Sequence, residues 1–500
     1  MATTSPTGIG LRSERGPVLL ALMLSTALVA LDATIIATAS ATIARQLGGF
    51  EQLPWLFSSY LLAQAVGTPV FGRLADVLGR KRLMLAGVGL FFVGSVLCGA
   101  AWSMPAMVAG RVLQGLGAGA VMPVSQTIAA DIYTLEERAK AQGYLASVWA
   151  ISSVVGPTLG GVFSEFVSWR WIFFVNVPLC ALAAWMLLRR YHESPREGAR
   201  EPIDYVGAGL LTAGSTLLLL GLLEGGSRWA WASAPSLAVL GAAVLLLAAF
   251  WLHGRRTRYP VVDLAILRRR VVGVSTAISL LVGVIVLALS TYVPVYAQGV
   301  LGVGPLVAGF ALAAMTVGWP ISASNAGRLY LRLGFRWTAV IGSLLVLVGT
   351  ALTLLLGATS PVVAVAATCF VVGVGMGLTA VPTLIAAQSS AAFTERGAVT
   401  GTNMFARSLG SAVGVAVCGA VVNARTTLGA DGAPQGPGLM SAVHVVFVLL
   451  ALCAAVLVAL AALMPADRRA ALERRAWLAR QAGQEREAAS TVAPTTGPTA

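Results

Sequence analysis

The feature that most constrains this chain is a series of fourteen apolar runs, each long enough to cross a lipid bilayer. A membrane-spanning helix needs about 20 apolar residues, whereas a soluble chain carries about a quarter charged residues instead of the 11% found here. The runs cover residues 17–39, 54–72, 83–101, 105–127, 142–164, 171–188, 206–223, 235–252, 271–293, 305–326, 337–356, 361–385, 400–423 and 441–464. They predict an all-α integral membrane protein with fourteen transmembrane helices.

The basic residues between these runs lie almost entirely on one side. When the gaps are numbered alternately, 28 of the 34 Lys and Arg residues fall in one set and four in the other. The remaining two, Arg111 and Arg407, lie inside predicted spans. By the positive-inside rule this predicts a multi-pass protein of the cell inner (plasma) membrane with both termini in the cytoplasm. The net charge of +14 is then a topology signal, and we expect no nucleic-acid partner.

The chain lacks the usual marks of a metal site or an ATP-driven machine. Its five cysteines stand singly in apolar runs, and neither HExxH nor GxxxxGK[ST] occurs. We therefore expect no metal, no cofactor and no enzymatic activity. An ion gradient is the energy source that remains.

An internal repeat divides the chain. Residues 72–80, GRLADVLGR, return as residues 327–335, GRLYLRLGF, and Glu137-Arg138 is matched by Glu395-Arg396 at a similar offset. The repeat predicts two six-helix halves with two helices inserted between them. The predicted organisation is a cytoplasmic N-terminus (1–16), the N-terminal half (17–190), a linker (191–205), the inserted helices (206–252), a second linker (253–270), the C-terminal half (271–465) and a largely disordered cytoplasmic tail (466–500).

The first copy of the repeat carries a recognisable motif. Residues 72–82, GRLADVLGRKR, resemble the loop signature G-x-L-A-D-x-x-G-R-K of the major facilitator superfamily, whose fold consists of two such parallel halves. The resemblance implies a latch that joins the halves on the cytoplasmic side, and Leu331 in place of the aspartate predicts a weaker latch in the second copy. The alternative is a simple basic turn. The motif residues are Gly72, Arg73, Asp76, Gly79, Arg80 and Lys81.

Two charged residues lie inside apolar helices. Asp32, in LDATIIATAS, resembles the first-span signature of the 14-span drug:proton antiporter family, the EmrB/QacA subfamily. Arg111, with Gln114 and Gly115 in RVLQGLGAG, resembles that family's fourth-span motif. Counting from the predicted span ends, both charges lie about 10 Å below the outer surface, so we expect them to meet. The resemblance implies proton coupling by Asp32 and Arg111, and the alternative is a fixed structural ion pair.

Two further candidates lie in the fifth and thirteenth spans. Residues 152–161, SSVVGPTLGG, resemble the antiporter signature G-x-x-x-G-P-x-x-G-G through Gly156, Pro157, Gly160 and Gly161. This implies export by antiport, and a packing role is the alternative. Arg407 is a candidate contact for substrate or lipid, and the alternative is that it extends to the membrane surface.

Together these resemblances imply a proton-coupled efflux transporter that exports amphipathic or lipophilic small molecules, such as antibiotics and dyes, by alternating access. Its expected partners are a small-molecule substrate, protons and membrane lipids, and we expect a monomer. Because Asp32 is the one mid-span carboxylate, neutral or amphipathic cargo, or monovalent rather than divalent cations, is favoured. A dedicated exporter of one metabolite or antibiotic, or a membrane sensor that transports nothing, are the alternative functions.

Overall fold

The computed structural model describes residues 10, 13–48, 52–193, 204–225, 229–257, 260, 264–428, 434–435 and 438–465. The predicted tail 466–500 lies outside the described residues, as do most of the predicted N-terminus 1–16 and most of the first linker, 191–205.

The described chain is almost entirely helical. Its helices are α1 (Gly16–Leu47), α2 (Leu53–Leu78), α3 (Arg80–Gly99), α4 (Met104–Ile132), α5 (Leu135–Val162), η2 (Phe163–Val167), α6 (Trp171–Phe174), α7 (Asn176–Arg190), α8 (Tyr205–Glu224), α9 (Ala234–Arg256), α10 (Leu264–Arg268), α11 (Arg270–Gly299), α12 (Pro305–Leu333), α13 (Phe335–Thr353), α14 (Val362–Ser390), η3 (Phe393–Glu395), α15 (Arg396–Asn423) and α16 (Leu439–Leu463). Two short strands, β1 (Thr427–Leu428) and β2 (Pro434–Gln435), pair antiparallel, with Thr427 opposite Gln435.

The helices confirm an all-α membrane fold of about fourteen spans. Thirteen helical segments of the described chain are long and apolar enough to cross a membrane. The fourteenth predicted position is occupied by α2, which has 26 residues but includes serines, a glutamine, glycines and two prolines. These small and polar residues suit α2 because it packs between other helices, where a large apolar surface is not required.

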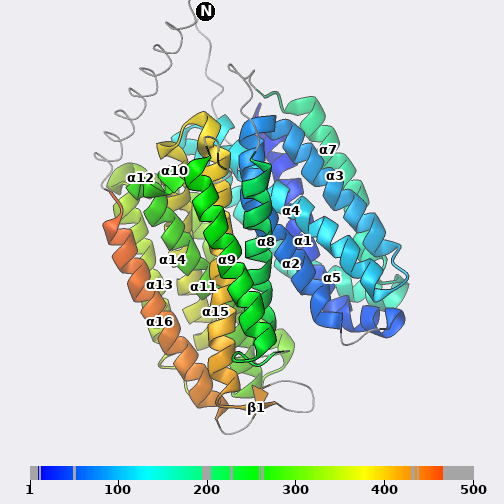
Figure 1. Ribbon diagram of the computed structural model, residues 1–500. Coiled ribbons are helices and arrows are strands. Elements are labelled where there is room, and N and C mark those ends of the chain that lie inside the picture. The colour runs from blue at the N-terminus through cyan, green and yellow to red at the C-terminus, as the bar shows by residue number, and fades with distance from the viewer. Residues whose placement is uncertain are drawn as a thin grey trace, which may run out of the picture.

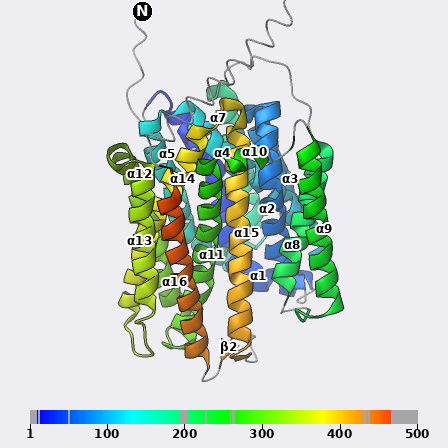
Figure 2. The same ribbon diagram turned by 60° about the vertical axis from the view of Figure 1, so that its left-hand side comes forward.

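The helices form two bundles with an inserted pair beside them (Figures 1 and 2). Helices α1–α7 and α11–α16 each surround their own cluster of buried apolar side chains. The inserted helices α8 and α9 pack against each other. Leu219 of α8 packs with Leu62 and Val66 of α2 and with Ala412 of α15. The inserted pair therefore covers the seam where α2 of one bundle meets α15 of the other.

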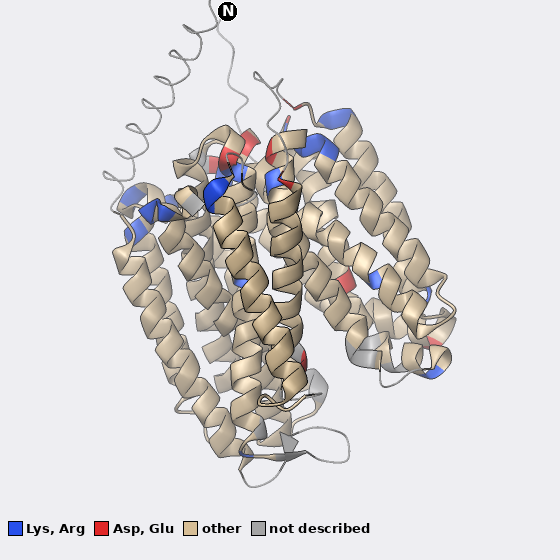
Figure 3. Cartoon of the chain, in the orientation of Figure 1, with Lys and Arg blue, Asp and Glu red and all other residues tan. Residues whose placement is uncertain are grey.

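Charged residues are concentrated at one end of the molecule (Figure 3). This end, which we call the basic end, carries the α2–α3, α12–α13 and α14–α15 connections. Helix α1 begins there and α16 ends there, so both ends of the described bundle lie on the same side (Figure 1). Few charged residues lie along the middle of the helices, and those few define the candidate site.

Candidate functional site

The centre of the N-terminal bundle contains a buried ion pair. Arg111 Nη1 of α4 lies 2.5 Å from Asp32 Oδ2 of α1, and both side chains are at most 1% exposed. Seventy-nine residues separate them in the chain. The structure thus brings together the two charges that the sequence places inside spans, at a depth where an unpaired charge is costly.

Polar neighbours complete this pair. The side-chain amide of Gln114 donates to Asp32 Oδ1 (3.1 Å) and to Ser95 Oγ of α3 (2.8 Å), while its oxygen accepts from Arg111 Nη1 (2.9 Å). Arg111 Nε also donates to the Leu56 carbonyl oxygen of α2 (3.0 Å). Each carboxylate oxygen of Asp32 therefore accepts one hydrogen bond, from a different residue of α4.

An aromatic ring also contacts the arginine. The Arg111 guanidinium lies over the Tyr60 ring of α2, 4.2 Å from its centroid, in a cation–π contact. Tyr60 is 2% exposed, and its hydroxyl has no hydrogen-bond partner among the described residues. Sequence reasoning missed Tyr60 and Ser95, because a tyrosine and a serine in apolar helices are common and neither belongs to a motif.

Glycines allow the helices to approach closely enough for these contacts. A Cβ added at Gly115 of α4 would collide with the Tyr60 carbonyl oxygen, and one at Gly94 of α3 would lie 2.5 Å from the Gln114 amide nitrogen. Gly115 thus holds α2 against α4, and Gly94 holds α3 against α4. The motif glycine that follows Gln114 acts as a packing residue that places the Tyr60 ring beside Arg111.

The glycine–proline motif of α5 contacts α1 next to Asp32. A Cβ at Gly156 would collide with Thr34 Oγ1, and that hydroxyl donates to the Ser152 carbonyl oxygen (2.9 Å). Thr34 lies two residues after Asp32. The other motif residues are Pro157 inside α5, buried Gly160, and Gly161, which has open space around it; a π-helical turn, η2, follows.

The loop motif at the basic end joins the two bundles. Asp76 of α2 is 3% exposed and accepts hydrogen bonds from the backbone N–H groups of Gly397 (3.0 Å) and Ala398 (2.7 Å) in the first turn of α15. A carboxylate at a helix N-terminus is stabilised by the unpaired N–H groups and the helix dipole. A Cβ at Gly72 would lie 2.5 Å from the Gly397 carbonyl oxygen, so this glycine permits the crossing.

Arg80 extends the same junction. Its guanidinium bonds Asp76 Oδ1 (3.1 Å) and the Phe393 carbonyl oxygen (2.5 Å), lies 3.2 Å from Asp131 Oδ2, and stacks over the Phe393 ring at 4.1 Å. Asp131 of α4 also pairs with Arg396 of α15 at 2.8 Å. We call Asp76, Arg80, Asp131 and Arg396 the basic-end latch.

The remaining motif residues lie around this latch. The backbone N–H groups of Arg80 and Lys81 donate to the Glu193 carboxylate at 2.7 and 3.1 Å, so Glu193 caps α3. Gly79 lies directly before this cap. Its backbone φ is +101°, a conformation that residues other than glycine rarely adopt. Arg73 is partly exposed, one turn before Asp76.

The second copy of the motif builds a different junction. Leu331, at the position equivalent to Asp76, is 48% exposed. There α5 meets α12 at Gly143, where a Cβ would lie 2.5 Å from Ser324 Cβ, and Arg138 of α5 donates to Ser389 Oγ of the neighbouring α14 (3.0 Å). This α5–α12 junction therefore lacks a carboxylate equivalent to Asp76, because Leu331 of α12 occupies that position.

Arg407 lies in α15, apart from the other candidates. It is the twelfth of 28 residues in the helix and is partly exposed. Its side chain forms no hydrogen bond with any described residue. No carboxylate of the described residues lies within 4 Å of its guanidinium.

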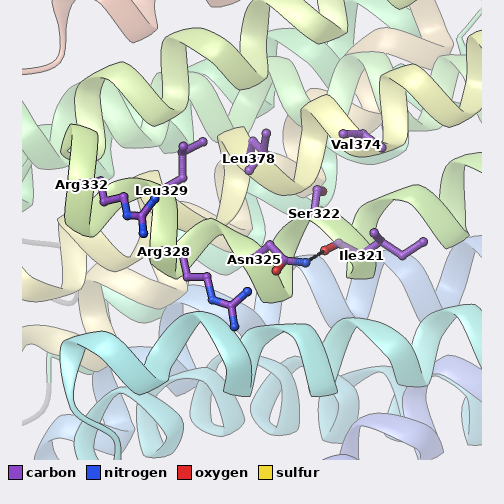
Figure 4. Close-up of a pocket in the computed structure, with 8 residues that line it drawn as sticks. All are labelled: Ile321, Ser322, Asn325, Arg328, Leu329, Arg332, Val374 and Leu378. Atoms are coloured by element: carbon purple, nitrogen blue, oxygen red, sulfur yellow. Dashed lines mark hydrogen bonds between the residues drawn. The ribbon is translucent and has the colours of Figure 1, made fainter.

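A pocket of about 390 Å³ opens between α12 and α14 (Figure 4). It contains none of the residues singled out above. Two exposed arginines and an asparagine, whose amide donates to the Ile321 carbonyl oxygen (2.9 Å), supply its polar groups. Its lining consists of Ile321, Ser322, Asn325, Arg328, Leu329, Arg332, Val374 and Leu378.

Known proteins resemble this chain over most of its length. Multidrug resistance protein 3 of Bacillus subtilis (strain 168) is 32% identical over 408 residues, which are 81% of this chain and 79% of the relative. Efflux pump FUS6 of Gibberella fujikuroi is 32% identical over 81% of this chain and 75% of its own length. The crystal structure of the human organic anion transporter MFSD10 (TETRAN) has the same fold, with a TM-score of 0.60 at 16% identity, covering 90% of this chain and 99% of that one.

The family model of the Major Facilitator Superfamily matches residues 22–415. That range includes the Asp32–Arg111 pair, the basic-end latch and Arg407. The family model, the relatives and the many membrane-spanning helices identify the chain as a membrane transporter and not an enzyme. The chain belongs to the Major Facilitator Superfamily.

Proposed function

We propose that this protein is a proton-coupled efflux transporter of the plasma membrane that exports amphipathic small molecules by alternating access. The basic end faces the cytoplasm in this proposal, in keeping with the positive-inside rule. The names of the relatives support export, since they include a multidrug resistance protein, a multidrug transporter and an efflux pump.

The contacts between the bundles correspond to one state of such a cycle. In the described residues, the latch and the α5–α12 junction hold the bundles together at the basic end. Figure 1 shows the N-terminal bundle diverging from the other bundle toward the opposite end. In an alternating-access cycle, these contacts suit a state that is closed toward the cytoplasm.

The observation that carries the proposal is the buried Asp32–Arg111 pair. Protonation of Asp32 would remove the negative charge that holds Arg111, and deprotonation would restore it. Because Gly156 and Thr34 lock α1 to α5, a shift of α1 at Asp32 would be transmitted to α5. Helix α5 in turn meets α12 of the other bundle at Gly143 and Ser324. This chain of contacts connects proton binding to movement of the halves.

The test is dye efflux from a bacterium that lacks its own pumps. Cells expressing wild type, Asp32→Asn or the matched control Glu165→Gln at equal membrane abundance are loaded with a cationic, a neutral or an anionic amphipathic dye, with and without a protonophore. Glu165 is an exposed carboxylate in η2, outside the buried network. We expect efflux by wild type and Glu165→Gln, its loss in Asp32→Asn, and its collapse with the protonophore.

The outcomes separate the parts of the proposal. Efflux that continues in Asp32→Asn but stops with the protonophore would place the proton site elsewhere. Efflux that resists the protonophore would contradict proton coupling altogether. Absence of efflux for every dye tested would favour a dedicated exporter of a single compound.

A further inference from the structure

The middle of the described helices carries an excess positive charge. Arg407 lies eleven residues into α15, about 16 Å from the start of the helix, which is roughly half the thickness of a bilayer core. Asp32 and Arg111 neutralise each other at their own buried site. Helices α11 to α16 contain no acidic residue, so the C-terminal bundle supplies no counter-charge at this depth.

Helix geometry places Arg407 on the inner side of α15. Successive residues of a helix are about 100° apart. Leu409 and Ala412 pack with α8, which covers the outer side of the seam, and Leu409 is about 200° around the helix from Arg407. Met404, one turn before Arg407 and about 60° away, packs into the core of the N-terminal bundle. Arg407 therefore faces the region between the bundles and not the lipid.

Its neighbours on this side are neutral and already hydrogen-bonded. Asn403 pairs with Ser279 Oγ (2.5 Å) and Ser275 Oγ (3.0 Å) of α11, and Ser411 Oγ donates to the Gly283 carbonyl oxygen (3.2 Å). The Arg407 guanidinium, with its planar set of donors, is left available for a ligand. An ionisable residue at membrane depth is costly, and substrate and ion pathways are among the places where such residues occur.

We propose that Arg407 binds the anionic group of the cargo, so that the preferred substrates are amphipathic carboxylates. This rests on the proposed export function and names the substrate class. The guanidinium fork matches a carboxylate with two parallel hydrogen bonds. The apolar helices around it suit the hydrophobic part of the same molecule. The proposal departs from the cargo that the sequence favours, neutral molecules or monovalent cations, because an uncompensated arginine repels cations.

The test compares an acid with its neutral ester. Radiolabelled pyrenebutyrate is bound to the purified protein in detergent, without any ion gradient, and is displaced by unlabelled pyrenebutyrate or by its methyl ester. We expect wild type to prefer the acid by about 10- to 100-fold, the range expected when a charge-assisted bidentate contact is lost. Arg407→Gln should abolish the preference, and Arg407→Lys should retain part of it, since lysine keeps the charge but not the fork.

The matched control is Arg425→Gln. Arg425 is an exposed arginine just beyond the far end of the same helix, so this variant removes the same charge without touching the inner side of α15. It should bind the acid like wild type. Thermal unfolding of Arg407→Gln should match or exceed that of wild type, because the lost charge has no partner among the described residues.

Three results would overturn the inference: equal affinity of wild type for acid and ester, an acid preference that survives Arg407→Gln, or marked destabilisation by Arg407→Gln, which would reveal a structural role. The binding assay needs no proton gradient. An intact acid preference with no proton-driven efflux would therefore refute the proposed function alone, and proton-driven efflux without acid preference would refute this inference alone.

Discussion

At the scale of single residues, Asp32 and Arg111 show how two buried charges compensate each other's desolvation free energy. Each charge is desolvated, and each is tolerated because the other, with Gln114, satisfies it. Removal of one member leaves an uncompensated buried charge, which costs about 3–5 kcal/mol, whereas removal of both costs far less. Stability and proton coupling can therefore be measured separately at this pair.

We expect Asp32→Asn to lower the free energy of unfolding by about 3–5 kcal/mol and the double variant Asp32→Asn with Arg111→Gln to recover most of it. Neither should catalyse proton-driven efflux, because both lack the titrating carboxylate. Thermal unfolding in detergent and efflux in proteoliposomes are the two measurements. Recovery of transport together with stability in the double variant would show that the pair is purely structural.

Tyr60 separates the role of a ring from that of a hydroxyl. Its ring contacts Arg111, while its hydroxyl lacks a partner in the described part of the chain. We expect Tyr60→Phe to preserve efflux and to keep or raise stability, since it removes a buried unsatisfied group. Tyr60→Leu should lower stability by about 1–2 kcal/mol through the lost cation–π contact. Loss of efflux in Tyr60→Phe would instead indicate that the hydroxyl carries the proton.

At the scale of helices, small residues determine which elements can act together. Gly156 lets α5 touch α1 beside Asp32, and Gly72 lets α2 cross α15 beside Asp76. In both places the atoms closest to the glycine belong to another helix, so a single added methyl group would push the two helices apart. Close backbone approach at glycine is a common basis of helix association in membranes.

Gly156→Ala should therefore reduce proton-driven efflux at least about tenfold, because its methyl group would displace α5 from Thr34. Gly161→Ala is the matched control, five residues later in the same helix, where the added carbon would meet no described side chain and no other helix within 4 Å. It should transport like wild type. Initial efflux rates in proteoliposomes at equal protein content give the comparison, and equal rates for both variants would argue that the α1–α5 contact is unimportant.

At the scale of the whole molecule, the two junctions at the basic end differ in kind. The α2–α15 side is held by charges, through Asp76, Arg80, Asp131 and Arg396. The α5–α12 side is held by close packing, beside the hydrogen bond from Arg138 of α5 to Ser389 of α14. In the proposed transport cycle, opening of this end would break the charged contacts of the α2–α15 side.

Asp76→Asn should shift the molecule toward opening at the basic end. Loss of the carboxylate weakens its bonds to the α15 N-terminus and to Arg80, and a change of about 2 kcal/mol corresponds to roughly a 30-fold shift in the equilibrium. Spin labels at the exposed positions Leu78 and Leu331 would report a longer distance between the bundles.

The matched control is Glu137→Gln. Glu137 pairs with Arg15 within the N-terminal bundle at the same end, so its loss removes a carboxylate without touching the junction. The label distance should then remain that of wild type. An unchanged distance in Asp76→Asn would contradict a latch role for this motif.

Most of the helices, and the family, can be predicted from the amino-acid sequence. Hydropathy and helix length are local properties, so apolar runs predict spans wherever tertiary contacts lie, and α2 shows the limit, because its packing partners replace a uniformly apolar surface. Motif residues such as Asp32, Arg111 and Asp76 were also recognisable before any contact was known.

The contacts that these residues make depend on how the helices pack, and the sequence does not reveal them. The partners of Asp76 lie 321 and 322 residues away, and Tyr60 and Ser95 join the Asp32 site without any motif. The predicted start of the thirteenth span, residue 400, put Arg407 about two turns from the cytoplasmic end, whereas α15 begins one turn earlier, at Arg396. Whether a charged residue inside a helix is paired depends on the side chains of neighbouring helices. Those side chains lie far away in the sequence, so the residues around the charge do not predict them.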